Sequence, residues 1–161
     1  MSVLEVKTAG DPVLKQIAAP VQKIDKRIKK LLDDMAETMY ATEGLGIAAP
    51  QVGVSLRMVV VDVDGKRYDM INPKITFFSE DKVTDVEGCL SCPDLFGDVE
   101  RAEKIHVKFI TRYHKVKEMD AEGLLARCIQ HEVDHLEGRL FIDIAKNIQK
   151  GKPPQREGRV K

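Results

Sequence analysis

The chain of 161 residues is 43% hydrophobic and 32% charged, a composition typical of one soluble globular domain. This composition excludes an intrinsically disordered chain, a collagen-like chain and a disulfide-bonded scaffold. Lysine and arginine balance aspartate and glutamate at 26 each, so we expect no specific DNA partner for the protein as a whole.

Apolar runs and cysteine content bear on the location of the protein. No run approaches the roughly 20 apolar residues of a membrane-spanning helix, and we therefore expect no membrane partner. The first residues lack the basic stretch followed by an apolar one that marks a signal peptide. Three cysteines are a small and odd number, as expected for free thiols in a reducing compartment. These features predict a cytoplasmic protein.

Residues 24–40 have the periodicity of an amphipathic helix. One face of this helix carries the apolar side chains of Ile24, Ile28, Leu31, Leu32, Met35 and Met39. Asp25 is a candidate N-cap, and Gly44 lies just beyond the expected end of the helix. The segment 44–53 is too rich in glycine and proline for a regular element.

The middle of the chain has the patterns of β-strands. Residues 57–63 are rich in β-branched side chains. The dipeptide Asp64-Gly65 is a strong hairpin signal that leads into 66–71. Residues 105–109 alternate between apolar and polar side chains, which predicts a half-buried strand.

Residues 120–137 predict a second long helix, which Gly138 would end. Because helices flank a run of strands, the order of elements favours an α+β fold over a repeating βαβ fold. We expect a single domain over residues 1–145. Residues 146–161 carry six cations against one anion and almost no apolar side chains, so they predict a basic, flexible tail.

His131 and His135 lie four residues apart in the second predicted helix. Residues with this spacing share one helix face at about 5–6 Å, so two imidazoles can bind one metal ion. Glu132 lies one step around the helix, where a carboxylate can move a proton between a metal-activated water and a leaving group. The pattern predicts metal-dependent hydrolysis, and a hydrogen-bonded histidine pair in the core is the alternative.

Two histidines leave the third ligand to be identified. The acidic residues downstream of His135 have no motif around them, which argues against a metallopeptidase that shares only the helical pattern. Cys89 follows Gly88, and this glycine would let the backbone approach a bound group closely. Cys89 and Cys92 could instead join the histidines in a closed structural zinc site of a binding module. Glu132 would have no role in such a site.

Three blocks of the sequence, in their order and approximate spacing, resemble the signature motifs of the peptide deformylases. The blocks are Gly44-Leu45-Gly46-Ile47-Ala48-Ala49-Pro50-Gln51, Glu87-Gly88-Cys89-Leu90-Ser91 and Gln130-His131-Glu132-Val133-Asp134-His135. The resemblance implies a hydrolase that removes the formyl group from N-formylmethionyl peptides and releases formate. It also implies antiparallel β-sheets packed around a C-terminal metal-binding helix, with an amphipathic helix nearer the N-terminus.

The resemblance further implies a ligand set and a cofactor. Cys89, His131 and His135 would bind one divalent metal ion, with water in the fourth position. The family uses Fe²⁺, for which Zn²⁺, Ni²⁺ or Co²⁺ can substitute. One thiolate and two imidazoles suit several of these ions, so the metal is implied by the resemblance alone.

Catalytic and substrate-binding residues are implied in the same way. Glu132 would carry the proton to the departing amine, while the side chain of Gln51 and the backbone N–H of Leu90 would donate to the formyl oxygen. Ordinary core packing is the alternative role for Leu45 and Leu124. The residues expected around the substrate are Leu45, Gly46, Ile47, Gly88, Leu124 and Cys128.

The remaining expectations concern the partners of the protein and two arginines, Arg101 and Arg127. Nascent N-formylmethionyl peptides are the expected substrates. The basic tail could contact phosphates on the ribosome surface, and a solvated terminus with no partner is the alternative. Arg101 matches an arginine of the family and is expected to pair with Glu87, which would fix the loop of Cys89. Arg127 departs from relatives in which this position is apolar.

Overall fold

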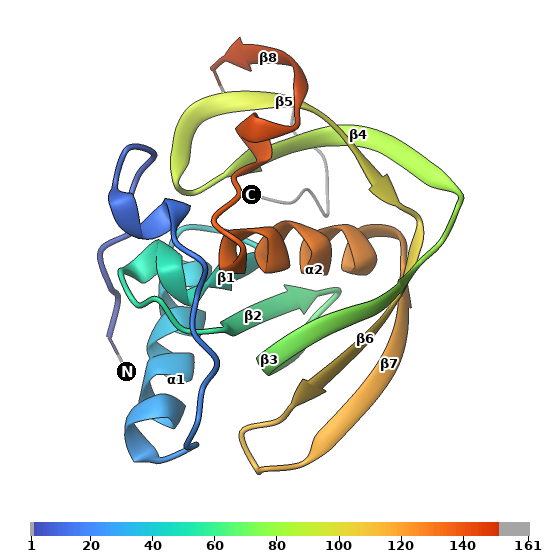
Figure 1. The fold of residues 1–161 in the computed structure, drawn as a ribbon. Coiled ribbons are helices and arrows are strands. Elements are labelled where there is room, and N and C mark those ends of the chain that lie inside the picture. The colour runs from blue at the N-terminus through green and yellow to red at the C-terminus, as the bar shows by residue number, and fades with distance from the viewer. Residues whose placement is uncertain (1, 152–161) are drawn as a thin grey trace.

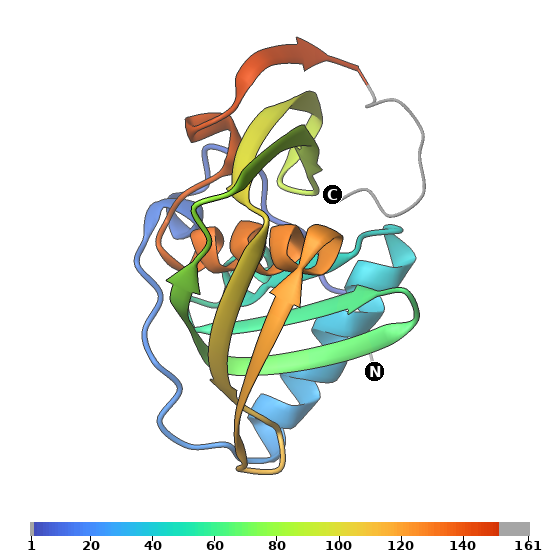
Figure 2. The same ribbon diagram turned by 90° about the vertical axis from the view of Figure 1, so that its right-hand side faces the viewer.

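The computed structural model describes residues 2–151, which form two antiparallel β-sheets with helix α2 between them (Figures 1 and 2). The helices are α1 (Lys26–Ala41) and α2 (Gly123–Leu136). The larger sheet has the strand order β1 (Gly46–Ala48), β2 (Met58–Val63), β3 (Lys66–Phe78), β6 (Lys104–Ile110) and β7 (Val116–Glu122). The smaller sheet contains β4 (Lys82–Cys89), β5 (Cys92–Ala102) and β8 (Lys146–Lys150). The expected α+β fold around a C-terminal helix is confirmed.

Helix α1 begins where the sequence predicts an N-cap, because the side chain of Asp25 accepts a hydrogen bond from the N–H of Ile28 at 3.1 Å. Its apolar face packs on one side of the five-stranded sheet, around β1 and β2. Leu32, Met35 and Met39 are completely buried there. The helix therefore closes one of the two main cores of the molecule.

Strands β2 and β3 form the predicted hairpin. Asp64 and Gly65 both have positive φ, at 57° and 78°, as a two-residue turn of type I′ requires. Strand β3 continues to Phe78, beyond the end predicted at residue 71. Asn72 adopts a φ of 52° at a register shift, so the strand bends there and then resumes its pairing with β6.

Helix α2 lies on the opposite side of the five-stranded sheet from α1, in contact with the second main core. It begins at Gly123, and not at residue 120 as predicted, because Asp120 and Ala121 pair with β6 as the end of β7. Gly138 ends the helical region with a φ of 73°, and a Cβ there would lie 2.5 Å from the carbonyl oxygen of Lys15. The N-terminal segment therefore crosses the end of α2 closely.

The three-stranded sheet covers the remaining face of α2. A two-residue turn joins β4 to β5, and β8 pairs with β5 along its other edge. The first residues of the predicted tail therefore form a strand, while residues 152–161 lie outside the described residues. The boundary at residue 145 and the flexible tail stay predictions. Within residues 2–151, neither helix has the length and apolar character needed to cross a membrane.

Candidate metal centre

Helix α2 holds His131 and His135 on one buried face, as their spacing predicts. The two imidazole ring centroids are 5.2 Å apart, and the residues are 2% and 1% exposed. Cys89 reaches this face from the end of β4, where its Sγ lies 3.4 Å from Nε2 of His135. One potential ligand atom from each of the three residues lies within 4.8 Å of the others. In the described part of the chain, this is the one group of side chains that could hold a metal ion.

The other two cysteines lie outside this group. Cys92 contacts Cys89 across the turn between β4 and β5, in a small core that contains Leu14 and Phe141. Cys128 is completely buried against β1, where its thiol donates to the carbonyl oxygen of Leu45 at 3.5 Å. The arrangement of donors is therefore the open Cys-His-His set, and not the closed set with two cysteines.

The donors fit a divalent metal ion. Nδ1 of His131 is engaged by Glu87 at 2.7 Å, whereas its Nε2 is buried and has no hydrogen-bond partner within residues 2–151. A buried ring nitrogen in this state is unfavourable unless a cation or another group binds it. One thiolate with two imidazoles is a donor set that suits zinc and iron ions. The residues present can therefore hold the metal that the fold implies.

The pKa values of the ligand groups are shifted by their surroundings. Burial lowers the pKa of His135 well below its usual value. Burial also lowers the pKa of His131. The hydrogen bond to Glu87 and the nearby carboxylates outweigh this effect, so the pKa of His131 is raised overall. Contact with Cys92, together with burial, raises the pKa of the Cys89 thiol well above its usual value. Binding of a metal would therefore displace the proton from this thiol.

Glu132 is completely buried next to the ligands without belonging to the ligand group. Neither carboxylate oxygen has a hydrogen-bond partner among the described residues, and Oε1 lies 3.9 Å from Nε2 of His135. Burial raises the pKa of Glu132 to about 7. A carboxyl group with this pKa can both accept and donate a proton near neutral pH.

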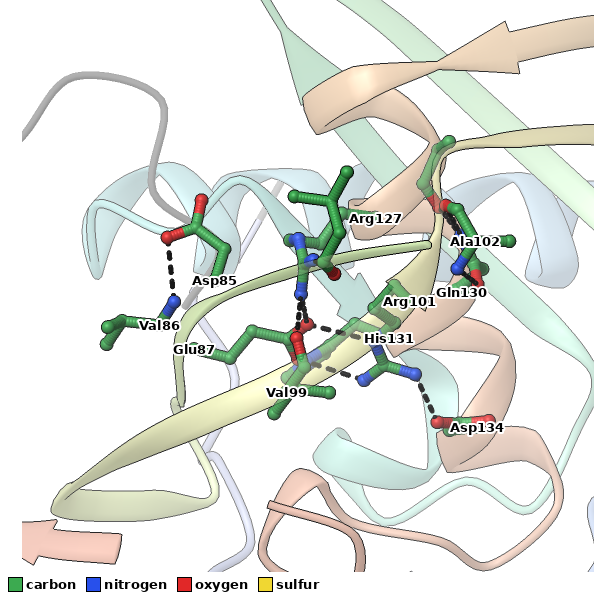
Figure 3. Close-up of polar contacts among 12 residues, drawn as sticks. Asp85, Val86, Glu87, Val99, Arg101, Ala102, Arg127, Gln130, His131 and Asp134 are labelled. Carbon is green, nitrogen blue, oxygen red and sulfur yellow. Dashed lines mark hydrogen bonds and ion pairs between the residues drawn. The ribbon is translucent and has the colours of Figure 1, made fainter. Parts of the chain in front are cut away.

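A buried network of charged groups contacts His131 through Glu87 (Figure 3). Glu87 of β4 accepts hydrogen bonds from Arg101 through both of its oxygens, each at 2.9 Å, as the resemblance implies. Arg127 of α2 also donates to Glu87, at 2.6 Å. Burial opposes ionisation of Glu87, but hydrogen bonds from Arg101 and His131 hold its pKa well below the usual range. Glu87 therefore accepts a hydrogen bond from the protonated Nδ1 of His131, which leaves Nε2 directed toward the ligand group.

Sequence reasoning missed two parts of this network. It did not connect Glu87 with His131, because the two residues lie 44 positions apart and belong to different elements. It noted Arg127 only as a departure from relatives. The signal that could have pointed to Arg127 is its position four residues before His131, on the same helix face.

Gln51 lies beside Cys89. Its side-chain Nε2 is 3.6 Å from Sγ of Cys89 and 3.3 Å from Oγ of Ser91, and its Oε1 accepts from the N–H of Ala48. The last contact fixes the amide orientation, so that the NH₂ group points toward the ligands. Leu90 occupies the turn between Cys89 and β5.

The apolar residues expected around the substrate belong to two different cores. Leu45, Leu124 and Cys128 belong to the core that contains α2, whereas Ile47 is buried in the core that contains α1. Gly46 lies against Glu132, and a Cβ at this position would be 2.6 Å from its Oε2. Gly88 pairs with Phe96 in the β4–β5 hairpin.

One thiol, two imidazoles and a buried carboxylate beside them define a hydrolase that uses a bound metal ion. A sequence model of the polypeptide deformylase family matches residues 3–151. The peptide deformylase of Pelotomaculum thermopropionicum is 52% identical over 155 residues, which cover 96% of this chain and 99% of that protein. The peptide deformylase of Carboxydothermus hydrogenoformans is 51% identical, with 92% and 97% covered.

Solved structures agree with the sequence comparison. The crystal structure of peptide deformylase from Thermotoga maritima has a TM-score of 0.89 at 42% identity, and the match covers 91% of this chain and 99% of that chain. Peptide deformylase from Ehrlichia chaffeensis in complex with actinonin has the same TM-score and identity, with 91% of each chain covered. The chain belongs to the polypeptide deformylase family.

Proposed function

We propose that the deformylase reaction of this chain, which removes the formyl group from N-formylmethionyl peptides, takes place at Cys89, His131 and His135. The observation that carries this proposal is the position of Glu132 beside three converging ligand atoms, with no hydrogen-bond partner in residues 2–151 for either carboxylate oxygen. A structural metal site needs no such carboxylate, whereas hydrolysis needs a group that transfers protons.

The proposed cofactor is one Fe²⁺ ion, for which Zn²⁺, Ni²⁺ or Co²⁺ can substitute. A divalent ion at this site would lower the pKa of a coordinated water and polarise the formyl carbonyl. Cys89 would bind it as the thiolate, His135 through a neutral imidazole and His131 through Nε2. Both the contact of Gln51 with Cys89 and the contact of Glu87 with His131 would orient these ligands.

Glu132 and two hydrogen-bond donors would carry out the remaining steps. The carboxylate of Glu132 would take a proton from the attacking water and deliver it to the amine nitrogen as the bond from formyl carbon to nitrogen breaks. The Nε2 group of Gln51 and the N–H of Leu90 would donate to the formyl oxygen as it gains negative charge. Formate and a peptide with a free amino terminus are the products.

The apolar surface around Leu45, Leu124 and Cys128 is the proposed site for the methionine side chain, because the three residues pack in the same core and the Cys128 thiol contacts Leu45 about one turn of α2 before His131. Gly46 and Gly88 would offer backbone groups to an extended peptide, in the way that an added strand binds. Ile47 would contribute through its backbone, since its side chain is buried toward α1.

An anaerobic assay of formate release from formyl-Met-Ala-Ser, with metal analysis of the same sample, tests the activity. Cys89→Ser is expected to lose most of the metal and the activity. Cys92→Ser and Cys128→Ser are matched controls, because both cysteines are buried nearby but lie outside the ligand group. Equal loss of metal from Cys89→Ser and Cys92→Ser would contradict the open site.

The proposal also includes a cytoplasmic location and a contact between the basic C-terminal residues and the ribosome. Lys146 and Lys150 are exposed on β8, and the sequence beyond residue 151 adds four further cations. Removal of residues 152–161 is expected to leave hydrolysis of a short formyl peptide unchanged and to weaken co-sedimentation with ribosomes at low salt. Equal co-sedimentation of both forms at low and moderate salt would refute the contact.

A further inference from the structure

Helix α2 holds the carboxylate of Glu87 at two points. Arg127 and His131 are four residues apart, so their side chains lie one above the other on the helix. Nη1 of Arg127 donates to Oε2 of Glu87 at 2.6 Å, and Nδ1 of His131 lies 2.7 Å from Oε1 (Figure 3). One helix therefore contacts both oxygens of one buried carboxylate.

Glu87 belongs to the same strand as a ligand. Cys89 lies two residues further along β4, and its Sγ is 3.4 Å from Nε2 of His135. Strand β4 thus contacts α2 at Glu87 and again at Cys89. The position of Glu87 relative to α2 consequently affects the separation of Cys89 from both histidines.

Arg127 makes two further contacts that join α2 to the three-stranded sheet. Its guanidinium donates to the carbonyl oxygen of Val83 in β4 at 2.6 Å and to that of Val99 in β5 at 2.9 Å. Its side chain is 7% exposed, so these bonds are protected from competing water. Planar guanidinium donors suit such a fixed set of acceptors better than a single ammonium group does.

Arg101 does not replace Arg127 in this role. Arg101 projects from β5 and fixes Glu87 relative to that strand. Its Nη1 also donates to Asp134 at 2.6 Å, so its charge is shared between two carboxylates. Of the two arginines that donate to Glu87, Arg127 is the one that comes from the same helix as His131 and His135.

We propose that Arg127 is a positioning residue. It fixes the position of β4 relative to α2 and thereby sets the geometry of Cys89, His131 and His135. Arg127 acts through Glu87, because the hydrogen bonds of its guanidinium go to Glu87 and to the backbone carbonyls of Val83 and Val99. The inference rests on the proposed ligand set. In the sequence, Arg127 is noted only because this position is apolar in some relatives, and the inference gives it a function.

Binding of Co²⁺ to metal-free protein tests this inference through a readout other than activity. In Arg127→Met, we expect about tenfold weaker Co²⁺ affinity, at the low end of what loss of an outer-shell partner costs. We also expect a shift in the visible absorption bands of bound Co²⁺, because these bands report the arrangement of the ligands. With formyl-Met-Ala-Ser, kcat should fall while KM changes little.

Arg112→Met is the matched control. Arg112 also ties a strand-rich region to a helix, by donating to Asp33 of α1 at 2.6 Å, but it contacts neither Glu87 nor a ligand. This variant should lose stability to heat and keep both the Co²⁺ affinity and the spectrum. Arg127→Lys keeps one donor for Glu87, so its affinity should lie between those of the unchanged chain and Arg127→Met.

Two results would overturn the inference. Arg127→Met with unchanged Co²⁺ affinity and spectrum but lower thermal stability would make Arg127 a purely structural link. If Arg127→Met does not fold, Arg127→Gln is measured, and unchanged affinity and spectrum there count equally against the inference. A missing thiolate band in the Co²⁺ spectrum of the unchanged chain would instead refute the ligand set itself.

Discussion

Helices α1 and α2 are similar in length, at 16 and 14 residues, but they bury different proportions of polar side chains. The buried face of α1 is mostly apolar and packs on the five-stranded sheet. The buried residues of α2 include five polar or charged side chains: Arg127, Gln130, His131, Glu132 and His135. Burial of apolar surface stabilises α1 directly, whereas each polar group of α2 needs a partner to offset its desolvation.

Most of the polar groups of α2 have such partners. Gln130 bonds both backbone groups of Ala102, and Arg127 bonds Glu87 and two carbonyls. In the described residues, the exceptions on α2 are Glu132 and one ring nitrogen of each histidine. On α1, Oε2 of Glu37 is the single buried polar side-chain atom without a partner in residues 2–151. The comparison teaches that the site is recognised less by buried polarity than by a cluster of buried polar atoms that have no partner among the described residues.

The sharpest test of the difference between the helices is Glu132→Gln. We expect activity to fall by about 10²–10⁴-fold, because this range is typical of the loss of a general acid–base group. Bound metal should remain, and the unfolding midpoint should not fall, since the lost carboxylate has no partner whose bond is broken. Near-normal turnover of a metal-replete variant would remove Glu132 from the mechanism.

Gly46→Ala tests the same carboxylate from the facing strand. The new Cβ would lie 2.6 Å from Oε2 of Glu132 and 2.9 Å from Sγ of Cys128, so the carboxylate must move. We expect a decrease in kcat of about 10²-fold with metal retained, as for a misplaced catalytic group. Gly65→Ala, at a strained turn remote from the site, should reduce stability and leave kcat per folded molecule unchanged. Full activity of Gly46→Ala would show that Glu132 tolerates displacement.

Met35→Ala probes the apolar helix. Met35 is completely buried between α1 and the five-stranded sheet, so its truncation leaves a cavity. We expect the free energy of unfolding to decrease by about 2–5 kcal/mol. The kcat/KM of the remaining folded protein should stay unchanged, as urea unfolding and formate release on the same samples would check. A large loss of kcat/KM would mean that α1 also supports the site.

The smallest expected effect concerns the pH dependence of the contact between α1 and the sheet. Hydrogen bonds from Arg112, opposed by partial burial, lower the pKa of Asp33 from 3.8 to about 2, with a further contribution from Arg67. The stabilisation is present above the unfolded pKa and is lost as pH falls through the folded pKa. We expect about 1 kcal/mol, after allowance for solvent screening.

Urea unfolding of the unchanged chain and of Asp33→Asn between about pH 5 and about pH 2 measures this contribution. The difference in unfolding free energy between the two proteins should shrink toward acidic pH, because protonation removes the charge of Asp33. A constant difference over this range would show that the ion pairs with Arg67 and Arg112 do not stabilise the fold.

Local signals in the sequence predicted local structure well. The N-cap at Asp25, the turn at Asp64-Gly65 and the histidine pair on α2 each depend on residues within one turn of helix or hairpin. The three motifs of the resemblance correctly indicated the family and the fold.

Apart from the ligand set and the pair of Glu87 with Arg101, which the resemblance implies, structure that depends on distant residues was not predicted. Strand β4 is rich in charged residues and contains a glycine, and five of its eight residues are exposed or only half-buried. Its strand character comes from pairing with β5. The link from Arg127 through Glu87 to His131 depends on contacts over 40 or more positions, which no local pattern encodes.

The contact between Cys89 and His135 spans 46 positions, and the helix that fills the space between the sheets follows strands β1 to β7 in the chain. During synthesis, the ribosome releases the chain from its N-terminal end, so α1 and the β2–β3 hairpin emerge well before α2. Until residue 136 has emerged, the two sheets lack the element that joins them and two of the three donors. A growing copy of the protein therefore gains its activity only after the whole of α2 has left the ribosome.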